Sequence, residues 1–228
     1  MIRLDAATVL LQWAVGGMAF CWFTTRHRVV SLGYGWLLRS VCGVMAIGAF
    51  AAAQVLGTNP LRDVAALATA AACAVGLVVS VVRRHAGVSG ERAEHDRRSA
   101  RVAAMTGIER AVDEDRQRTG GPEFPPILDL VPVAVGVVGL IGASIDTGGP
   151  VWLALIRTFA GAALFGAISD AMLLGHWYLT QPGLPRWLLS ELVTAVGWVW
   201  PIELVALLLP TGMISVLTGA VDDGWDGV

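Results

Sequence analysis

The chain has 228 residues, of which 55% are hydrophobic and 15% charged, and its formal net charge is −2 at pH 7. Soluble domains carry about 25% charged residues, so this composition excludes an ordinary soluble domain. The lack of a basic excess argues against nucleic acid as a partner. Every basic residue is arginine, which gives an actinobacterial-like composition typical of GC-rich coding.

Six apolar tracts are each long enough to cross a bilayer core about 30 Å thick. They cover residues 6–25, 34–57, 62–82, 127–147, 152–176 and 187–209. These tracts predict an all-α fold, a polytopic bundle with three transmembrane helices in 1–83 and three more in 127–221. A charged helical loop, 84–126, separates the two halves. A seventh apolar stretch, 211–221, is too short to cross alone, and an acidic tail, 222–228, follows it.

Arginine placement predicts the orientation of these spans. The arginines gather in alternate connections: Arg26, Arg28 and Arg39 around the first, nine between Arg83 and Arg118, and Arg186 in the fifth. Basic loops of membrane proteins stay in the cytoplasm. We therefore expect a multi-pass protein of the bacterial inner membrane, with the N-terminus outside and the 84–126 loop inside.

The middle of the long loop, 91–118, lacks proline and is rich in helix formers. Its apolar residues recur at three- and four-residue steps: Val102, Met105, Ile108 and Val112. This spacing predicts a helix with one narrow apolar stripe. The helix is either a solvated loop docked on the inner face of the bundle or a regulatory or partner-binding arm.

Small residues at regular steps predict close helix–helix contacts, because lipid offers no hydrophobic drive for association. They are Ala68, Ala72 and Gly76 in the third span, Gly136, Gly139, Gly142 and Ala143 in the fourth, and Thr158, Ala162 and Gly166 in the fifth. Asp170 continues the stripe of the fifth span. We therefore expect Asp170 to face another helix rather than lipid.

Ionisable residues inside the spans are the first candidates for function, because charge is costly there. The predicted topology sorts them into an outer layer of Asp146, Arg157 and Glu203, and an inner layer of Asp129, Asp170, His176 and Glu191, with His27 and Arg39 at the same level. Arg157 and Glu203 reach matching heights on the antiparallel fifth and sixth spans. They predict either a structural ion pair or a gate or anion-attracting site.

The segment 171–186 places one histidine, two aromatic residues and a proline-glycine turn at the inner membrane boundary. A neutral His176 imidazole suits a haem axial ligand or a hydrogen bond to a quinone head group, and Trp177 and Tyr178 suit packing against a flat ring. The alternative is an interfacial belt, with His176 bonded to a backbone carbonyl. A second axial histidine would be His27 or would come from a partner subunit.

The run 171–179, Ala-Met-Leu-Leu-Gly-His-Trp-Tyr-Leu, resembles a segment of uncharacterised bacterial polytopic membrane proteins. The resemblance covers these nine residues. It implies a polytopic fold and carries no activity with it.

Motifs of hydrolases, metalloproteases, P-loop enzymes and dinucleotide-binding proteins are absent, and no Cys/His spacing predicts a metal site. The sequence therefore predicts no intrinsic catalytic activity. The leading hypothesis is a non-catalytic multi-pass inner-membrane protein that works with other membrane subunits in a larger assembly, linked to electron transfer by a haem or quinone near His176. The alternative is a small-solute or ion transporter that uses Asp170, Arg157 and Glu203.

Overall fold

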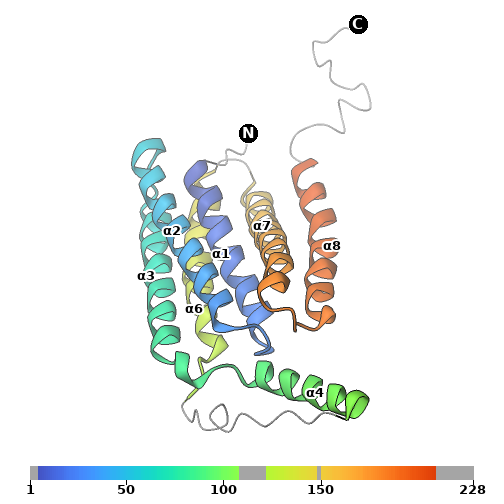
Figure 1. The fold of residues 1–228 in the computed structure, drawn as a ribbon. Coiled ribbons are helices and arrows are strands. Elements are labelled where there is room, and N and C mark those ends of the chain that lie inside the picture. Colours follow the sequence, from blue (N-terminus) through green and yellow to red (C-terminus); the bar gives the residue numbers. More distant parts are fainter. Residues whose placement is uncertain (1–4, 108–121, 148–149, 209–228) are drawn as a thin grey trace, which may run out of the picture.

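The computed structural model describes residues 5–107, 122–147 and 150–208, and it is an all-helical bundle (Figure 1). The long helices are α1 (Ala6–Thr25), α2 (Leu32–Leu56), α3 (Pro60–Val82), α6 (Leu130–Asp146), α7 (Val151–Thr180) and α8 (Arg186–Leu208). The remaining described helices are η1 (Arg84–Ala86), α4 (Ser89–Thr106), which is polar, and η2 (Pro126–Asp129). Within the described residues six helices, with η2 counted as the start of α6, are long and apolar enough to cross a membrane. The chain is a multi-pass membrane protein, and the six predicted spans are confirmed.

Short polar segments set the helix ends. The Asp5 carboxylate accepts a hydrogen bond from the Thr8 amide at 2.7 Å, which caps α1. Asn59 caps α3 in the same way, through the Arg62 amide at 2.9 Å, and Pro60 occupies the first turn. Gly57, with φ of 138°, ends α2 in a backbone conformation that suits glycine. The spans α2 and α3 therefore turn back on each other through residues 57–59 and run antiparallel.

The first helix, α1, lies at the centre of the bundle. It packs against α2, α6 and α7, while α3 packs against α2 and α6. Of the 18 most apolar consecutive residues of each helix, 56% are buried in α1 but only 17% in α8. The helix α8 packs mainly on α7. Figure 1 shows α8 at the edge of the bundle. The outer surface of α8 is therefore open to lipid or to another protein.

At one end of the bundle lie the connections 26–31 and 181–185 and the described parts of the segment between α3 and α6, 83–107 and 122–125 (Figure 1). We call this the arginine-rich end, because the described arginines of these three connections lie here. The helix α4 runs across it at a steep angle to the spans. The opposite end carries the connection 57–59, the end of α6 and the start of α7.

The small-residue stripe of α7 packs closely on α1, as predicted. A Cβ placed on Gly16 would lie 1.8 Å from the carbonyl oxygen of Ala162, and one placed on Gly166 would lie 2.2 Å from the carbonyl oxygen of Gly16. The two backbones therefore touch. The stripe of α6 is also buried: Gly136 packs against Val15 and Thr69, and Gly139 against Ala65 and Leu11.

The predicted stripe of the third span is wrong in part. Ala68 is exposed and Ala72 only partly buried, whereas Gly76 is buried as expected. The buried face of α3 instead runs through Ala65, Ala66, Thr69, Ala70 and Cys73. This span is so rich in alanine that several faces have the same small-residue spacing, and contacts with α2 and α6 decide between them.

Two predicted boundaries differ from the structure. The fifth span continues to Thr180 rather than to residue 176, because the polar residues after Leu174 fit the last turns of the helix and Pro182 follows soon after. The loop helix begins at Ser89 and ends at Thr106, where Gly107 adopts a left-handed conformation with φ of 69°. Ile108, Val112, the seventh apolar stretch and the acidic tail lie outside the described residues.

Candidate functional site

Asp170 lies in the core near the arginine-rich end and is fully buried. The Tyr34 hydroxyl of α2 donates to its carboxylate at 2.6 Å, and the Thr24 hydroxyl of α1 donates to the other carboxylate oxygen. Asp170 thus joins three helices, and both of its oxygens have a donor. The prediction that Asp170 faces other helices is confirmed, and its partners are hydroxyl groups.

A second buried charge lies on α2, where Arg39 forms a two-bond pair with Asp129 of η2. Both nitrogen–oxygen distances are 2.7 Å, and the two residues are 3% and 1% exposed. Such fork-to-fork pairs are the strongest kind of ion pair in proteins. Gly35 makes room for the pair, because a Cβ there would lie 2.7 Å from Arg39 Nη1, whereas a Cβ on Gly76 would be in ordinary contact, 3.5 Å from Arg39 Cδ.

An aromatic ring covers one face of the Arg39 guanidinium. Phe124 lies over it with 4.1 Å between the guanidinium carbon and the ring centroid, a cation–π contact. Nη1 of Arg39 is buried, and no described residue forms a hydrogen bond with it. Because Phe124 belongs to the segment that enters α6, the position of that segment controls how the Arg39–Asp129 pair is covered.

Glu123, the residue before Phe124, forms hydrogen bonds with several polar residues of the arginine-rich end. Its carboxylate accepts from Arg92 at 2.9 Å, from Ser89 at 3.1 Å and from Arg28 at 3.2 Å. Arg83 donates to its backbone carbonyl at 3.1 Å. Glu123 therefore ties α4, the end of α3 and the first connection together.

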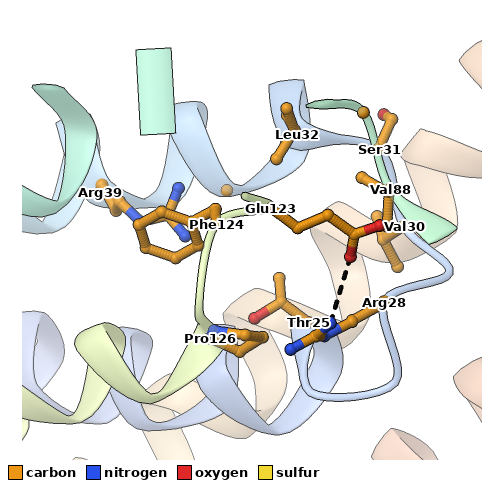
Figure 2. A pocket seen from close by; sticks show the side chains of 12 residues that line it. Thr25, Arg28, Val30, Ser31, Leu32, Arg39, Val88, Glu123, Phe124 and Pro126 are labelled. Carbon is orange, nitrogen blue, oxygen red and sulfur yellow. Dashed lines mark hydrogen bonds and ion pairs between the residues drawn. The ribbon is translucent and has the colours of Figure 1, made fainter. Parts of the chain in front are cut away.

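Figure 2 shows a small pocket between these groups, lined by residues of the first connection, the start of α2 and the segment before η2. Its volume is about 30 Å³, which has room for about two water molecules. That volume is far too small for a haem or a quinone ring. The pocket therefore has room for water beside Arg28 and Glu123.

The three residues of the predicted cofactor segment point in different directions. His176 is exposed, and its Nδ1 lies 2.8 Å from the carbonyl oxygen of Met172 in the same helix. Trp177 donates to the Ser31 hydroxyl at 3.2 Å and packs edge-on against Tyr34. Tyr178 donates to the carbonyl of Pro185 at 2.7 Å. The structure therefore does not gather the three side chains around one space.

Arg157 and Glu203 lie near each other on α7 and α8, as their predicted heights require. A Cβ on Gly161, one turn after Arg157, would lie 3.5 Å from Glu203 Oε1. In the described parts of the chain, however, neither side chain forms an ion pair or a hydrogen bond. Arg157 Nε and Glu203 Oε2 are buried without a partner. The predicted ion pair is thus not formed in this structure.

Glu191 lies at the arginine-rich end of α8, where it contacts the end of α1. Its Oε2 is 3.1 Å from Arg26 Nη2 and 3.2 Å from His27 Nε2. The His27 ring also packs edge-on against Trp187. His27 is therefore engaged by Glu191, and it does not face His176 as a second haem ligand would.

Sequence reasoning placed Arg39 and Asp129 in one layer without pairing them, and it missed Tyr34, Thr24 and Glu123. A signal existed for the pair, since a lone arginine inside an apolar span demands a buried partner. Tyr34 gave no such signal, because a tyrosine at a helix end also suits the membrane interface. Among the described residues, no group of three or more His, Cys, Asp or Glu side chains could hold a metal ion.

The chain matches no protein-family model, no curated protein and no solved structure. Its function is therefore argued from the geometry above.

Proposed function

We propose that the chain is a non-catalytic subunit of a larger assembly in the bacterial inner membrane, linked to electron transfer through His176. The observation that carries the proposal is the outward-facing imidazole of His176 on α7. The exposed face of α7 around it consists of Ile168, Met172, Gly175, His176 and Leu179. Gly175 has nothing within 4 Å of where a Cβ would lie, so a partner helix or a flat ring can approach closely.

The hydrogen bond at Nδ1 sets what the other ring nitrogen can do. A carbonyl oxygen only accepts, so in a neutral His176 the proton is on Nδ1 and Nε2 carries a lone pair. Metal-binding histidines are commonly oriented by such a carbonyl contact. An Nε2 lone pair suits a haem iron, or it accepts a hydrogen bond from a quinol hydroxyl. It does not donate to a quinone carbonyl unless the ring is protonated.

Trp177 and Tyr178 hold the last turns of α7 in place. Trp177 donates to Ser31 at the start of α2, and Tyr178 donates to Pro185 just before α8. The proposal therefore assigns them a positioning role and leaves His176 as the contact residue. Because His27 is bound to Glu191, the proposal takes the second axial ligand of a haem from a partner subunit. For a quinol, the partner subunit would form the other side of the binding site.

The sharpest test places a photo-crosslinking amino acid at Met172, which is 63% exposed, with Val64 on α3, 67% exposed, as the control. The proposal expects a specific crosslinked protein from position 172 and only lipid products from position 64. Equal crosslinking at both positions, or at neither, would refute a partner on the α7 face.

The redox part is tested on the assembly recovered in gentle detergent. A Soret band that is lost in both His176→Gln and His176→Ala would support a haem ligand. A colourless assembly whose quinol oxidation weakens in His176→Gln and falls further in His176→Ala would support the quinol contact. If spectrum, activity and growth are unchanged in His176→Ala, the redox role of His176 is excluded.

A second candidate, a small-solute or ion transporter, is favoured by one observation: among the described residues, Arg157 and Glu203 each have one buried polar atom without a hydrogen-bond partner. An unsatisfied polar group inside a span is costly and suggests a bound solute or ion. Asp170 does not belong to that site, because its oxygens are engaged by Thr24 and Tyr34. Proteoliposome flux that is lost in Arg157→Gln and Glu203→Gln, but retained in His176→Ala, would favour this candidate over the first.

A further inference from the structure

We propose that α4 lies on the surface of the bilayer beside the bundle, with Val102 and Met105 inserted among anionic lipid head groups and the arginines of its second half paired with phosphate. This inference is independent of the role of His176. It gives the long loop a lipid partner, which differs from both a solvated loop and a protein-binding arm.

Contacts along α4 fix how the helix is rotated about its axis. Its first turn is held by Ser89 and Arg92 on Glu123, and Gly90 lies against the carbonyl oxygen of Arg28. Further along, Arg98 donates to the carbonyl oxygen of Pro182 at 3.3 Å. Pro182 belongs to the connection between α7 and α8, so the Arg98 face of α4 is turned toward the ends of the spans and the membrane plane.

The exposed apolar residues of α4 lie on this same face. Each helix residue adds about 100° of rotation, so Met105 points within about 20° of Arg98 and Val102 within about 40°. Met105 is 71% exposed and Val102 49% exposed, because the described residues do not cover this half of the helix. Two apolar side chains thus point toward the membrane plane at the level where the spans end.

The charges near these residues suit an anionic surface. From Arg97 to Thr106 the helix carries Arg97, Arg98 and Arg101 and no acidic residue, and Glu94, one turn earlier, lies 3.8 Å from Arg97 and 3.7 Å from Arg98. Arginine binds phosphate with several donors at once, and its stem can lie along apolar groups while the guanidinium reaches the head groups. A basic helix with inserted apolar residues is the usual pattern of membrane-surface attachment.

The test uses the full chain in nanodiscs, with nitroxide labels on single introduced cysteines. The native Cys21, Cys42 and Cys73 are buried, so the unsubstituted chain serves as the labelling blank. Met105→Cys and Val102→Cys report the proposed face, and Asp96→Cys, about 160° away from Arg98, reports the opposite face. Accessibility to oxygen, which concentrates in lipid, and to a water-soluble nickel relaxant is measured in phosphatidylcholine alone and with phosphatidylglycerol added.

We expect the labels at positions 102 and 105 to become accessible to oxygen and protected from nickel when phosphatidylglycerol is present, while position 96 stays accessible to nickel. Each arginine contributes about fivefold to binding of an anionic surface. A combined Arg97→Gln, Arg98→Gln and Arg101→Gln variant should therefore remove the response to phosphatidylglycerol. Nickel access that is equal at positions 96 and 105 would overturn the proposal, and so would protection from both relaxants, which would place a protein surface over this face.

Discussion

Asp170 illustrates how single residues keep charge inside this bundle. Its carboxylate is fully buried, yet both oxygens accept from hydroxyl groups, one on α1 and one on α2. A buried polar group is tolerated when its hydrogen bonds are complete and is costly when they are not. The partners of Asp170 therefore matter to stability as much as Asp170 does.

Removal of a hydrogen-bond donor to Asp170 should destabilise the fold more than replacement of Asp170 by asparagine. We expect Tyr34→Phe to cost about 1–3 kcal/mol, because it leaves a buried carboxylate oxygen without a donor. Asp170→Asn should cost less than Asp170→Leu, since the amide keeps hydrogen bonds to both hydroxyls. Thermal unfolding in detergent measures each change. Tyr178→Phe is the matched control, because its half-buried hydroxyl bonds one carbonyl; an equal loss there would contradict the argument.

The Arg39–Asp129 pair predicts strong coupling between two substitutions. Arg39→Met or Asp129→Leu alone should cost about 3–5 kcal/mol, because each leaves an unpaired buried charge. The double variant should be more stable than the sum of the two losses predicts. A double-mutant cycle from unfolding midpoints measures the coupling. Simple additivity would show that the pair is not formed in the membrane.

Asp5 gives the N-terminal end of α1 a dependence on pH. Burial by itself raises the pKa of this carboxyl, but hydrogen bonds from Thr8 and Arg62 and the charge of Arg62 outweigh burial and lower the pKa below its ordinary value. The folded state therefore holds the proton less tightly than the unfolded state. This contribution to stability is complete above the unfolded pKa and is lost as pH falls through the folded pKa. Stability measured on the acid side of pH 4 should fall less steeply in Asp5→Asn than in the native chain.

At the scale of helices, the sequence predicts a packing face well where a polar residue inside the span marks it. In α7 small residues also lie off the stripe, at Ala160, Ala163 and Ala167, but Asp170 continues the stripe and has to face protein. In α3 alanine occurs on every side, and the predicted face ran through the exposed Ala68. Hydropathy defines how long a span is, but an alanine-rich span has no single small-residue face.

Substitution of glycines should separate tight contacts from open surface. Gly16→Ala and Gly166→Ala should sharply lower the yield of folded protein, because each Cβ would lie less than 3 Å from backbone atoms of the facing helix. Gly175→Ala and Gly197→Ala should be tolerated, since nothing lies within 4 Å of their Cβ positions. Monodispersity in size-exclusion chromatography reports the difference. Loss of fold in Gly197→Ala would mean that α8 is packed against something in the isolated protein.

For the molecule as a whole, the proposed orientation places the arginine-rich end in the cytoplasm. Cysteine introduced at Ser99 on α4 should resist an impermeant reagent added to intact cells and react after the cells are opened. Cysteine introduced at Thr58 should react in intact cells. The buried native cysteines should contribute little labelling. The reverse pattern would invert the topology and remove the basis for a cytoplasmic α4.

The arrangement of helices around α1 could not be predicted, because each span contributes an apolar surface that fits many neighbours equally well. The same limit applies to the site. Arg39 is 90 residues from Asp129 in the sequence, and only the packing of α2 beside α3 and η2 brings Arg39 close to Asp129 and the neighbouring Glu123 segment. Arg157 and Glu203 were placed near each other correctly because short antiparallel connections relate their heights directly.

The Arg39–Asp129 pair also has a consequence for how the chain is made. Asp129 is synthesised 90 residues after Arg39, so α2 must enter the bilayer while its arginine is still unpaired. The guanidinium can stay hydrated at the arginine-rich end until η2 and α6 arrive and neutralise it. Asp170 meets the opposite situation, because Tyr34 precedes it by 136 residues and Thr24 by 146. The first half of the protein is therefore inserted while Arg39 is still unpaired. When α7 inserts, by contrast, both hydroxyl groups that bind Asp170 are already present.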